Sequence, residues 1–213
     1  AELKYNYKPN EKLTITPRIN YKQQTPWQTE VIDSGEVYDK VAQRYTGNLT
    51  LSYNATRKIN IVTGAEAYRD EAKDRSPDTT SHFSNGERTI SYFNQAYFVQ
   101  TLFKHRIVNV ILGGRYDQHS EYGSAFVPRV GLTKKIKRSH FKLLYSNSFR
   151  APAIENITLQ TDAGIKPEKT NVMELEIGQQ LSRKSILTVN FFDITTENPI
   201  IYVVDSNQND TYI

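Results

Sequence analysis

Apolar and polar residues alternate along most of this chain, and this alternation limits what the chain can fold into. Within residues 45–54, Leu49, Leu51 and Tyr53 are separated by small polar residues. A period of two places successive side chains on opposite faces of a β-strand, so such a segment has one apolar and one polar face. The same alternation recurs at residues 13–22, 141–146 and 173–178. The chain is therefore predicted to be all-β, with one short candidate helix at residues 153–159.

The predicted strands are unusually long. Several of them exceed the roughly 5 or 6 residues usual in globular proteins and match the roughly 9 to 11 that a tilted membrane-spanning strand needs. Strand length therefore favours a membrane barrel over a soluble sandwich. About ten or eleven strands are expected, at residues 2–8, 11–23, 41–54, 58–70, 87–103, 106–118, 124–136, 140–150, 171–182, 186–195 and 199–204.

The predicted connections alternate between short and long. In an up-and-down barrel, short turns lie on the periplasmic side and longer loops on the outside, whereas Greek-key connections in a sandwich are not sorted in this way. The chain is therefore predicted to be part of an antiparallel up-and-down transmembrane β-barrel. The short connections are 8–11, 54–58, 103–106, 135–140 and 182–185, and the long ones are 24–40, 70–86, 118–123, 150–170 and 205–211.

Composition narrows the possibilities further. A mean hydropathy of −0.61 and the lack of any run of roughly 18 apolar residues argue against membrane-spanning helices. The chain contains no cysteine, so it has neither disulfides nor thiolate metal ligands. The net charge is only +4, and the basic residues are spread along the sequence. We therefore expect no nucleic-acid partner, because such a partner requires a dense row of basic side chains.

Four short segments, in their order and spacing, resemble the β-barrel of TonB-dependent outer-membrane receptors. The resemblance is specific between residues 113 and 178, and the strand pattern extends it over nearly the whole chain. The residues that carry it are Arg115, Tyr116 and Asp117 after a glycine pair; Pro128 and Arg129 before Val-Gly-Leu; Phe149, Arg150 and Pro152; and Pro167 and Glu168 followed by Glu176 and Gly178.

The resemblance implies that residues 1–213 are a partial barrel domain. Barrels of this family have about 22 strands, so about half of one is present, and the family's plug domain is expected to be absent. We interpret the chain as an excised fragment from the bacterial outer membrane. The implied function is active import of a scarce nutrient, such as an iron-siderophore, cobalamin, haem or glycan. The implied partners are outer-membrane lipid, the small nutrient ligand, such as a metal chelate, and TonB through the absent N-terminal parts.

Two other functions agree with the alternation alone. One is a passive porin or adhesin-type barrel, and the other is a soluble β-sandwich that acts as a binding module. A sequence upstream that encodes a plug would exclude the porin. Side chains of Leu49, Leu51 and Tyr53 packed between two sheets would establish the sandwich.

The family motifs have a structural interpretation. Pro128 lacks an N–H, so it should lie at a bulge or where its nitrogen faces no partner. Pro152 ends a strand and keeps the preceding residue extended. We therefore expect the motif residues to shape the barrel rather than to contact cargo.

Little in the sequence points to chemistry. No nucleophile-and-base motif is present and no histidine has metal-ligand spacing with another, so neither an enzyme nor a bound cofactor is expected. His105 and His140 fall in predicted short turns and are expected to be solvated. The candidate cargo contacts are aromatic residues in two predicted long loops, namely Trp27, Tyr38, His82 and Phe83. His119, with Glu121 and Tyr122, is placed similarly in the predicted loop 118–123.

Overall fold

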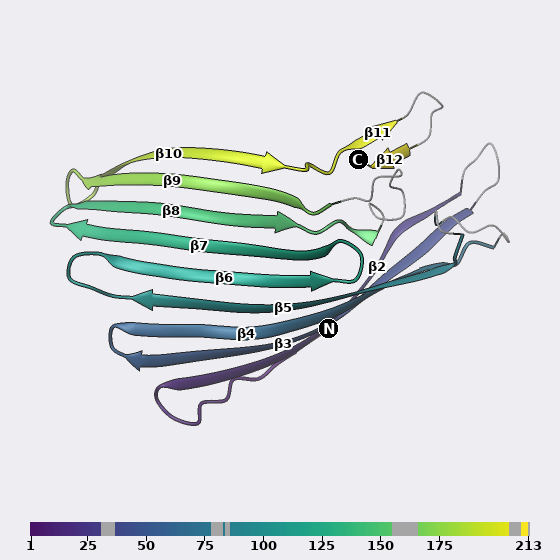
Figure 1. Ribbon diagram of the computed structural model, residues 1–213, viewed down its shortest axis with the longest axis horizontal. Helices are drawn as coiled ribbons and strands as arrows, with labels where there is room; N and C mark the ends of the chain where they lie inside the picture. The colour runs from purple at the N-terminus through teal and green to yellow at the C-terminus, as the bar shows by residue number, and fades with distance from the viewer. Residues whose placement is uncertain (31–36, 78–82, 84–85, 155–165, 205–209, 213) are drawn as a thin grey trace.

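Ten antiparallel strands form one curved layer in which each strand pairs with its neighbours in sequence (Figure 1). The computed structural model describes residues 1–30, 37–77, 83, 86–154, 166–204 and 210–212. The consecutive order is that of an up-and-down sheet and confirms the predicted fold class. The strands are β1 (Glu2–Lys4), β2 (Leu13–Glu30), β3 (Val37–Thr56), β4 (Ile59–Asp74), β5 (Thr89–Phe103), β6 (Asn109–His119), β7 (Gly123–Ile136), β8 (Ser139–Arg150), β9 (Glu168–Gln180) and β10 (Ile186–Glu197).

The two ends of the chain depart from the predicted strands. The segment 2–8 contains only the three-residue β1, followed by an isolated bridge between Tyr7 and Ile15. Near the C-terminus, β11 (Tyr202–Val204) pairs only with β12 (Asp210–Tyr212), in a separate two-stranded sheet. Of the predicted helix 153–159, Ile154 is helical and residues 155–159 lie outside the described part.

Two predicted long loops are wrong in extent. Residues 24–40 are mostly strand, because β2 continues to Glu30 and β3 begins at Val37, with a register shift between Gln24 and Trp27. A strand segment with water on both faces needs no apolar face, so the apolar alternation can stop although the ladder continues. The connection 118–123 is a tight turn instead of a long loop, since His119 pairs with Gly123, whose φ is 77°. Glycine adopts this left-handed conformation readily.

The apolar face of the sheet is open. Leu49 and Tyr53 are 44% and 43% exposed, and the register aligns Leu49 with Pro17 and Ala65 of the neighbouring strands. No second sheet packs on this face among the described strands, so the β-sandwich alternative is excluded. No described helix is both long enough and apolar enough to cross a membrane.

Aromatic residues border the apolar face at both ends. Tyr21 and Tyr45 are register partners near the long-connection end, with ring centroids 5.0 Å apart. Tyr53, Phe103 and Phe141 lie towards the short-turn end and are all exposed. Tyr45 and Tyr53 are separated along β3 by roughly 27 Å at about 3.4 Å per residue. Two aromatic girdles around an apolar band are typical of outer-membrane barrels.

Candidate functional site

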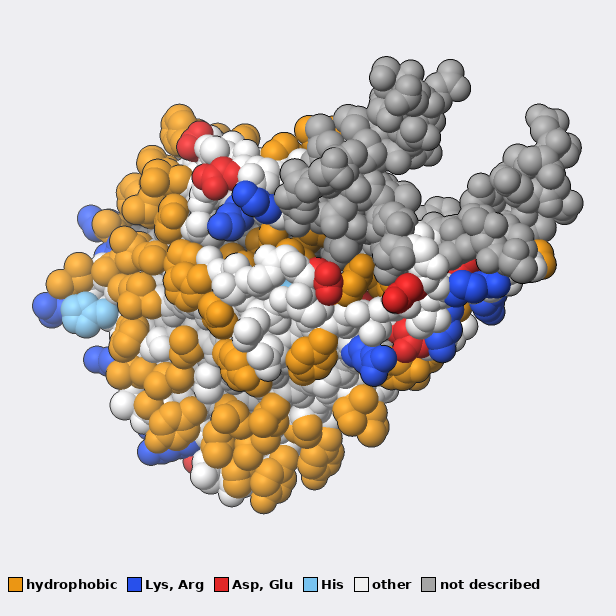
Figure 2. Space-filling model, turned by 45° about the vertical axis from the view of Figure 1, so that its right-hand side comes forward, with side chains coloured by type: hydrophobic (Ala, Val, Ile, Leu, Met, Phe, Trp, Pro, Cys, Tyr) orange, Lys and Arg blue, Asp and Glu red, His pale blue; other side chains and the backbone are white. Residues whose placement is uncertain are grey.

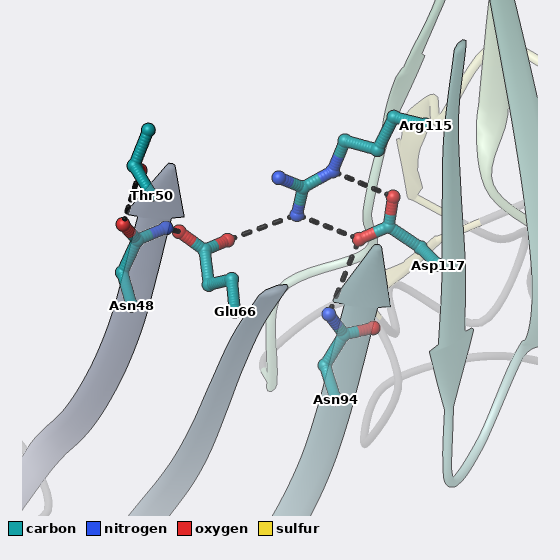
Figure 3. A network of polar contacts seen from close by, with 6 residues as sticks. All are labelled: Asn48, Thr50, Glu66, Asn94, Arg115 and Asp117. Atoms are coloured by element: carbon teal, nitrogen blue, oxygen red, sulfur yellow. Dashed lines mark hydrogen bonds and ion pairs between the residues drawn. The ribbon is translucent and has the colours of Figure 1, made fainter. Parts of the chain in front are cut away.

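A network of polar side chains crosses β3 to β6 on the polar face (Figure 3). Arg115 donates to Asp117 through Nε at 2.7 Å and Nη2 at 2.8 Å, and through Nη2 to Glu66 at 2.9 Å. Asn94 donates to Asp117 at 3.2 Å, while Asn48 donates to Glu66 at 3.4 Å. The two carboxylates outnumber the single guanidinium, so the network carries a net negative charge.

The fully buried Ala96 explains how this network crosses a strand. Ala96 of β5 is the register partner of both Glu66 of β4 and Asp117 of β6. Strands two apart are separated by about 10 Å, and only a long side chain spans that distance. Because Ala96 has a single methyl group, the Arg115 side chain can pass over β5 and reach Glu66. Sequence alternation places Arg115 and Asp117 on one face, but nothing in the sequence pairs them with Glu66 or Asn94.

An aromatic cluster continues the polar face towards the long connections. His119 stacks on Tyr122 with centroids 4.0 Å apart and an angle of 9°, and its ring lies 5.9 Å from Tyr92 and 6.4 Å from Tyr68. The Nδ1 atom of His119 accepts a hydrogen bond from the Glu121 amide. Burial raises the pKa of Tyr122, which lies in the turn after β6, so its phenol stays protonated at neutral pH.

Arg44 borders this cluster on β3. Its guanidinium donates to both carboxylate oxygens of Asp70, at 2.5 and 2.6 Å, and its Cζ lies 4.2 Å from the Tyr68 ring centroid. A planar guanidinium suits both contacts, because it forks onto a carboxylate and stacks on an aromatic face. The cluster thus places phenol and guanidinium groups around the buried imidazole of His119 at the end of the polar face.

Phe83, one of the candidate cargo contacts, is buried. Its ring packs with Ala72 and Ile90 on the polar-face side of β4 and β5, where Tyr92 and Ile154 also pack. The Nζ atom of Lys40 lies 4.7 Å above its centroid. Phe83, which precedes β5, and Ile154, which follows β8, therefore both lie over this face. Of the other candidates, Trp27 and Tyr38 lie on the paired backbone of β2 and β3 but their side chains are outside the described part, as is His82.

The motif residues Arg150 and Glu168 join the two ends of the long connection between β8 and β9. Their ion pair measures 3.1 Å. The backbone of Ile200 binds both, because its carbonyl accepts from Arg150 at 3.2 Å and its N–H donates to Glu168 at 3.3 Å. Pro152 and Pro167, which flank this tie, are buried, whereas Phe149 is half-buried.

Pro128 marks the point where the ladder between β7 and β8 begins. The pairs run from Arg129–Ser146 to Ile136–Ser139, so no β8 residue pairs with Pro128. Pro128 keeps its partner Gly114 on β6. Pro128 thus lies outside the β7–β8 ladder but within the β6–β7 ladder.

The expectation that His140 lies in a solvated short turn is wrong. The structure places His140 on the polar face of β8. It is the second residue of β8, its Nε2 atom lies 2.8 Å from Glu176, and its ring covers Gly178. A side chain at Gly178 would collide with that ring. Next to the His140–Glu176 pair along the polar face, Lys142 and Glu174 form an ion pair, with Lys142 Nζ 2.9 Å from Glu174 Oε1.

The chemistry available on this face is hydrogen bonding and charge. Among the residues that the structure describes, no group of three or more histidine, aspartate or glutamate side chains could hold a metal ion. The polar face presents carboxylates, amides and cationic groups to the space in front of it.

Sequence comparison matches residues 1–213 to the protein family described as TonB dependent receptor-like, beta-barrel. The chain belongs to this family. TonB-dependent receptors are transporters rather than enzymes, and they reside in the bacterial outer membrane. The apolar face is therefore the lipid-facing side of an outer-membrane barrel, and the polar face is its lumenal side. No curated protein matches the chain.

Solved receptors share this fold. A variant of the ferric enterobactin receptor PfeA from Pseudomonas aeruginosa aligns with a TM-score of 0.78 at 12% identity, over 94% of this chain and 34% of that chain. The FrpB iron transporter from Neisseria meningitidis aligns at 0.72 and 13% identity, over 100% and 38%. The siderophore receptor PirA from Pseudomonas aeruginosa aligns at 0.65 and 14% identity, over 99% and 49%. The chain thus spans about a third to a half of these proteins, and the likeness concerns the fold alone.

Proposed function

We propose that this chain forms part of the barrel wall of a TonB-dependent importer for a scarce, polar nutrient of the iron-chelate class. Cargo binds near the long connections and passes along the lumenal face, with energy supplied by TonB through other parts of the receptor. Family membership and the likeness to siderophore receptors support this function.

One observation carries the proposal. The cluster of His119, Tyr122, Tyr92, Tyr68 and Arg44 lies at the long-connection end of the lumenal face. Ferric siderophore complexes are polar, often aromatic and often anionic. Aromatic rings and a guanidinium are the groups that contribute most at binding interfaces. The short-turn end instead carries charged rungs such as Lys142–Glu174.

An uptake experiment tests the function. The full-length receptor that contains this chain is expressed in an outer-membrane receptor-deficient strain, and uptake of radioactive iron is measured with a panel of siderophores. At least one chelate should be taken up, and only in cells that retain TonB. Uptake that persists without TonB would identify a passive porin, and surface binding without uptake would identify an adhesin.

Two variants of the aromatic cluster and one control variant then test the site. His119→Ala and Tyr122→Ala should raise the half-saturating chelate concentration about five- to tenfold, the usual effect of removing a central binding residue. His105→Ala, at the short-turn end, is the matched control and should leave it unchanged. Equal uptake by all three variants would refute the proposed binding position. Trp27, Tyr38 and His82 stay predictions to be tested in the same assay.

A further inference from the structure

Each of the four short turns that link consecutive spanning strands carries two basic residues. These turns connect β3 to β4, β5 to β6, β7 to β8 and β9 to β10, and they lie together at the left of Figure 1. Neighbouring turns are separated by two strands, which is about 10 Å. The eight residues, here called the basic rim, are Arg57 and Lys58, Lys104 and Arg106, Lys137 and Arg138, and Arg183 and Lys184.

The side chains of the basic rim are available to an external partner. All eight residues are exposed, and no carboxylate in the described part of the chain forms an ion pair with any of them. At the opposite end of the sheet the arrangement differs. There Arg75 pairs with Asp39 at 2.7 Å and Arg150 pairs with Glu168 at 3.1 Å. The short-turn end therefore presents eight exposed cationic side chains that have no carboxylate partner in the described part of the chain.

The basic rim adjoins the lipid-facing surface directly. Ile107, Ile136 and Leu181 lie within or beside the same turns and are each more than half exposed. Figure 2 shows hydrophobic side chains along the left and lower margins, with basic side chains and a histidine at the left tip. Because the rim begins where the apolar band ends, its charges lie at the depth of the lipid headgroups.

The backbone of one rim residue gives an independent reason to assign the charge a role. Lys137 occupies the left-handed region with a φ of 53°, in a two-residue turn between β7 and β8. Glycine, asparagine or aspartate adopts this conformation more easily, and these residues dominate such turns. A strained backbone that holds a lysine is evidence that the side chain is needed there.

We propose that the basic rim binds the phosphate groups of anionic phospholipids in the periplasmic leaflet of the outer membrane. Short turns face the periplasm in barrels of this kind. Basic side chains at headgroup depth attract anionic lipids, and this attraction is screened by salt. The two basic residues of one turn are at most two positions apart in the sequence, so their Cα atoms lie within the screening length of about 8 Å at physiological ionic strength, whereas charges on neighbouring turns, about 10 Å apart, are largely screened from one another. The proposal depends on the barrel and its orientation and not on the cargo.

Lipid selectivity tests the proposal. The full-length receptor is reconstituted in phosphatidylcholine vesicles that contain a trace of spin-labelled phosphatidylglycerol or spin-labelled phosphatidylcholine. Electron paramagnetic resonance then gives the fraction of each label immobilised by the protein. Phosphatidylglycerol should associate about threefold more strongly at low salt, and the preference should shrink at high salt. Equal association of the two lipids would overturn the proposal, and would leave an acidic protein as the candidate partner.

Variants assign the preference to the rim. Replacing all eight rim residues by glutamine should abolish the preference, and the pair Arg57→Gln and Lys58→Gln should reduce it. The control pair Arg18→Gln and Lys22→Gln removes the same charge from the lumenal face of β2 and should have no effect. Loss of selectivity in the control pair, or its retention in the eightfold variant, would overturn the assignment.

A glycine variant separates the loss of charge from the loss of folding. Lys137→Gly removes one rim charge but relieves a left-handed lysine. It should lower the lipid preference while the protein stays at least as resistant to urea. A variant that keeps the full preference would show that Lys137 contacts no lipid phosphate.

Discussion

The Nη2 atom of Arg115 on β6 lies 2.9 Å from the Oε1 atom of Glu66 on β4, across the intervening strand β5. The two residues are 49 positions apart in the chain. Hydrogen bonds of the backbone ladder join only adjacent strands, so this contact braces three strands at the level of side chains. The motif residues Arg115 and Asp117 therefore contact strands β4 and β5 through Glu66 and Asn94.

Replacing Arg115 by glutamine should destabilise the receptor. Asp117 is 2% exposed and would lose its cationic partner, while Glu66 would lose the same guanidinium. Leaving a buried carboxylate unpaired costs about 1–3 kcal/mol. Urea unfolding of the full-length receptor in lipid vesicles, followed by circular dichroism, measures this loss.

A double variant provides the control for Arg115. In Arg115→Gln combined with Asp117→Asn, the buried Asp117 carboxylate is replaced by a neutral amide, and only the more exposed Glu66 keeps a charge without the guanidinium. The double variant should therefore be more stable than Arg115→Gln alone. Strictly additive losses would show that the two groups do not interact.

Alanine should be tolerated at Gly178 and not at Gly64. A Cβ at Gly64 would collide with the Leu49 carbonyl oxygen and the Phe98 ring, whereas at Gly178 its three nearest neighbours would all be atoms of the His140 ring. A backbone carbonyl cannot move without breaking the ladder, so Gly64→Ala should cost about 2 kcal/mol. Gly178→Ala should cost less than about 1 kcal/mol, because His140 can rotate away at the expense of its bond to Glu176.

The His140→Ala background checks this comparison. Without the imidazole, the added methyl group at Gly178 has no ring to displace, so Gly178→Ala should become neutral. Gly64→Ala should keep its full cost in the same background. A Gly178→Ala loss that His140→Ala fails to relieve would contradict the proposed clash.

Breaking the tie between Arg150 and Glu168 should loosen the chain locally. The Arg150 side chain is 59% exposed, and exposed ion pairs contribute about 0–1 kcal/mol to global stability. Ile200, however, has its amide bound to Glu168. Glu168→Ala should therefore accelerate hydrogen exchange at Ile200 while the urea midpoint hardly changes. Lys169→Ala, at the neighbouring exposed position, should alter neither quantity.

Lys137→Gly should stabilise the fold by up to about 1 kcal/mol, because glycine adopts the left-handed conformation without a Cβ clash. Asn198→Gly is the matched comparison, since Asn198 has a φ of 49°. Asparagine tolerates this region better than lysine, so the gain should be smaller there. A larger gain at Asn198 would show that backbone strain is not what limits Lys137.

Much of the sheet is predictable because its apolar side faces lipid. Segments such as 45–54 alternate strictly, and their strands and faces follow directly from the alternation. The prediction fails where strands leave the membrane, as at residues 24–30 of β2, because water then contacts both faces. It also fails at the turn after His119, where Gly123 alone signals a tight connection.

The lumenal network and the basic rim were not predictable in the same way. Alternation predicts that Arg115 and Asp117 lie on one face, but it does not say which residues of neighbouring strands are paired. It therefore cannot identify Glu66 as the third partner. The charges of the rim are dispersed in the sequence, from Arg57 to Lys184, and gather only because the turns share one edge of the sheet.

By itself, the sequence determined the β-strands, their long lengths and which side of each strand faces lipid, because these properties depend on residues two positions apart. The tertiary structure decided the register, the Arg115–Glu66 contact and the position of His140 over Gly178. Those features depend on which residues of different strands become neighbours. The hydrogen-bonded pairing of the whole sheet decides which residues become neighbours. Local alternation carries no information about that pairing.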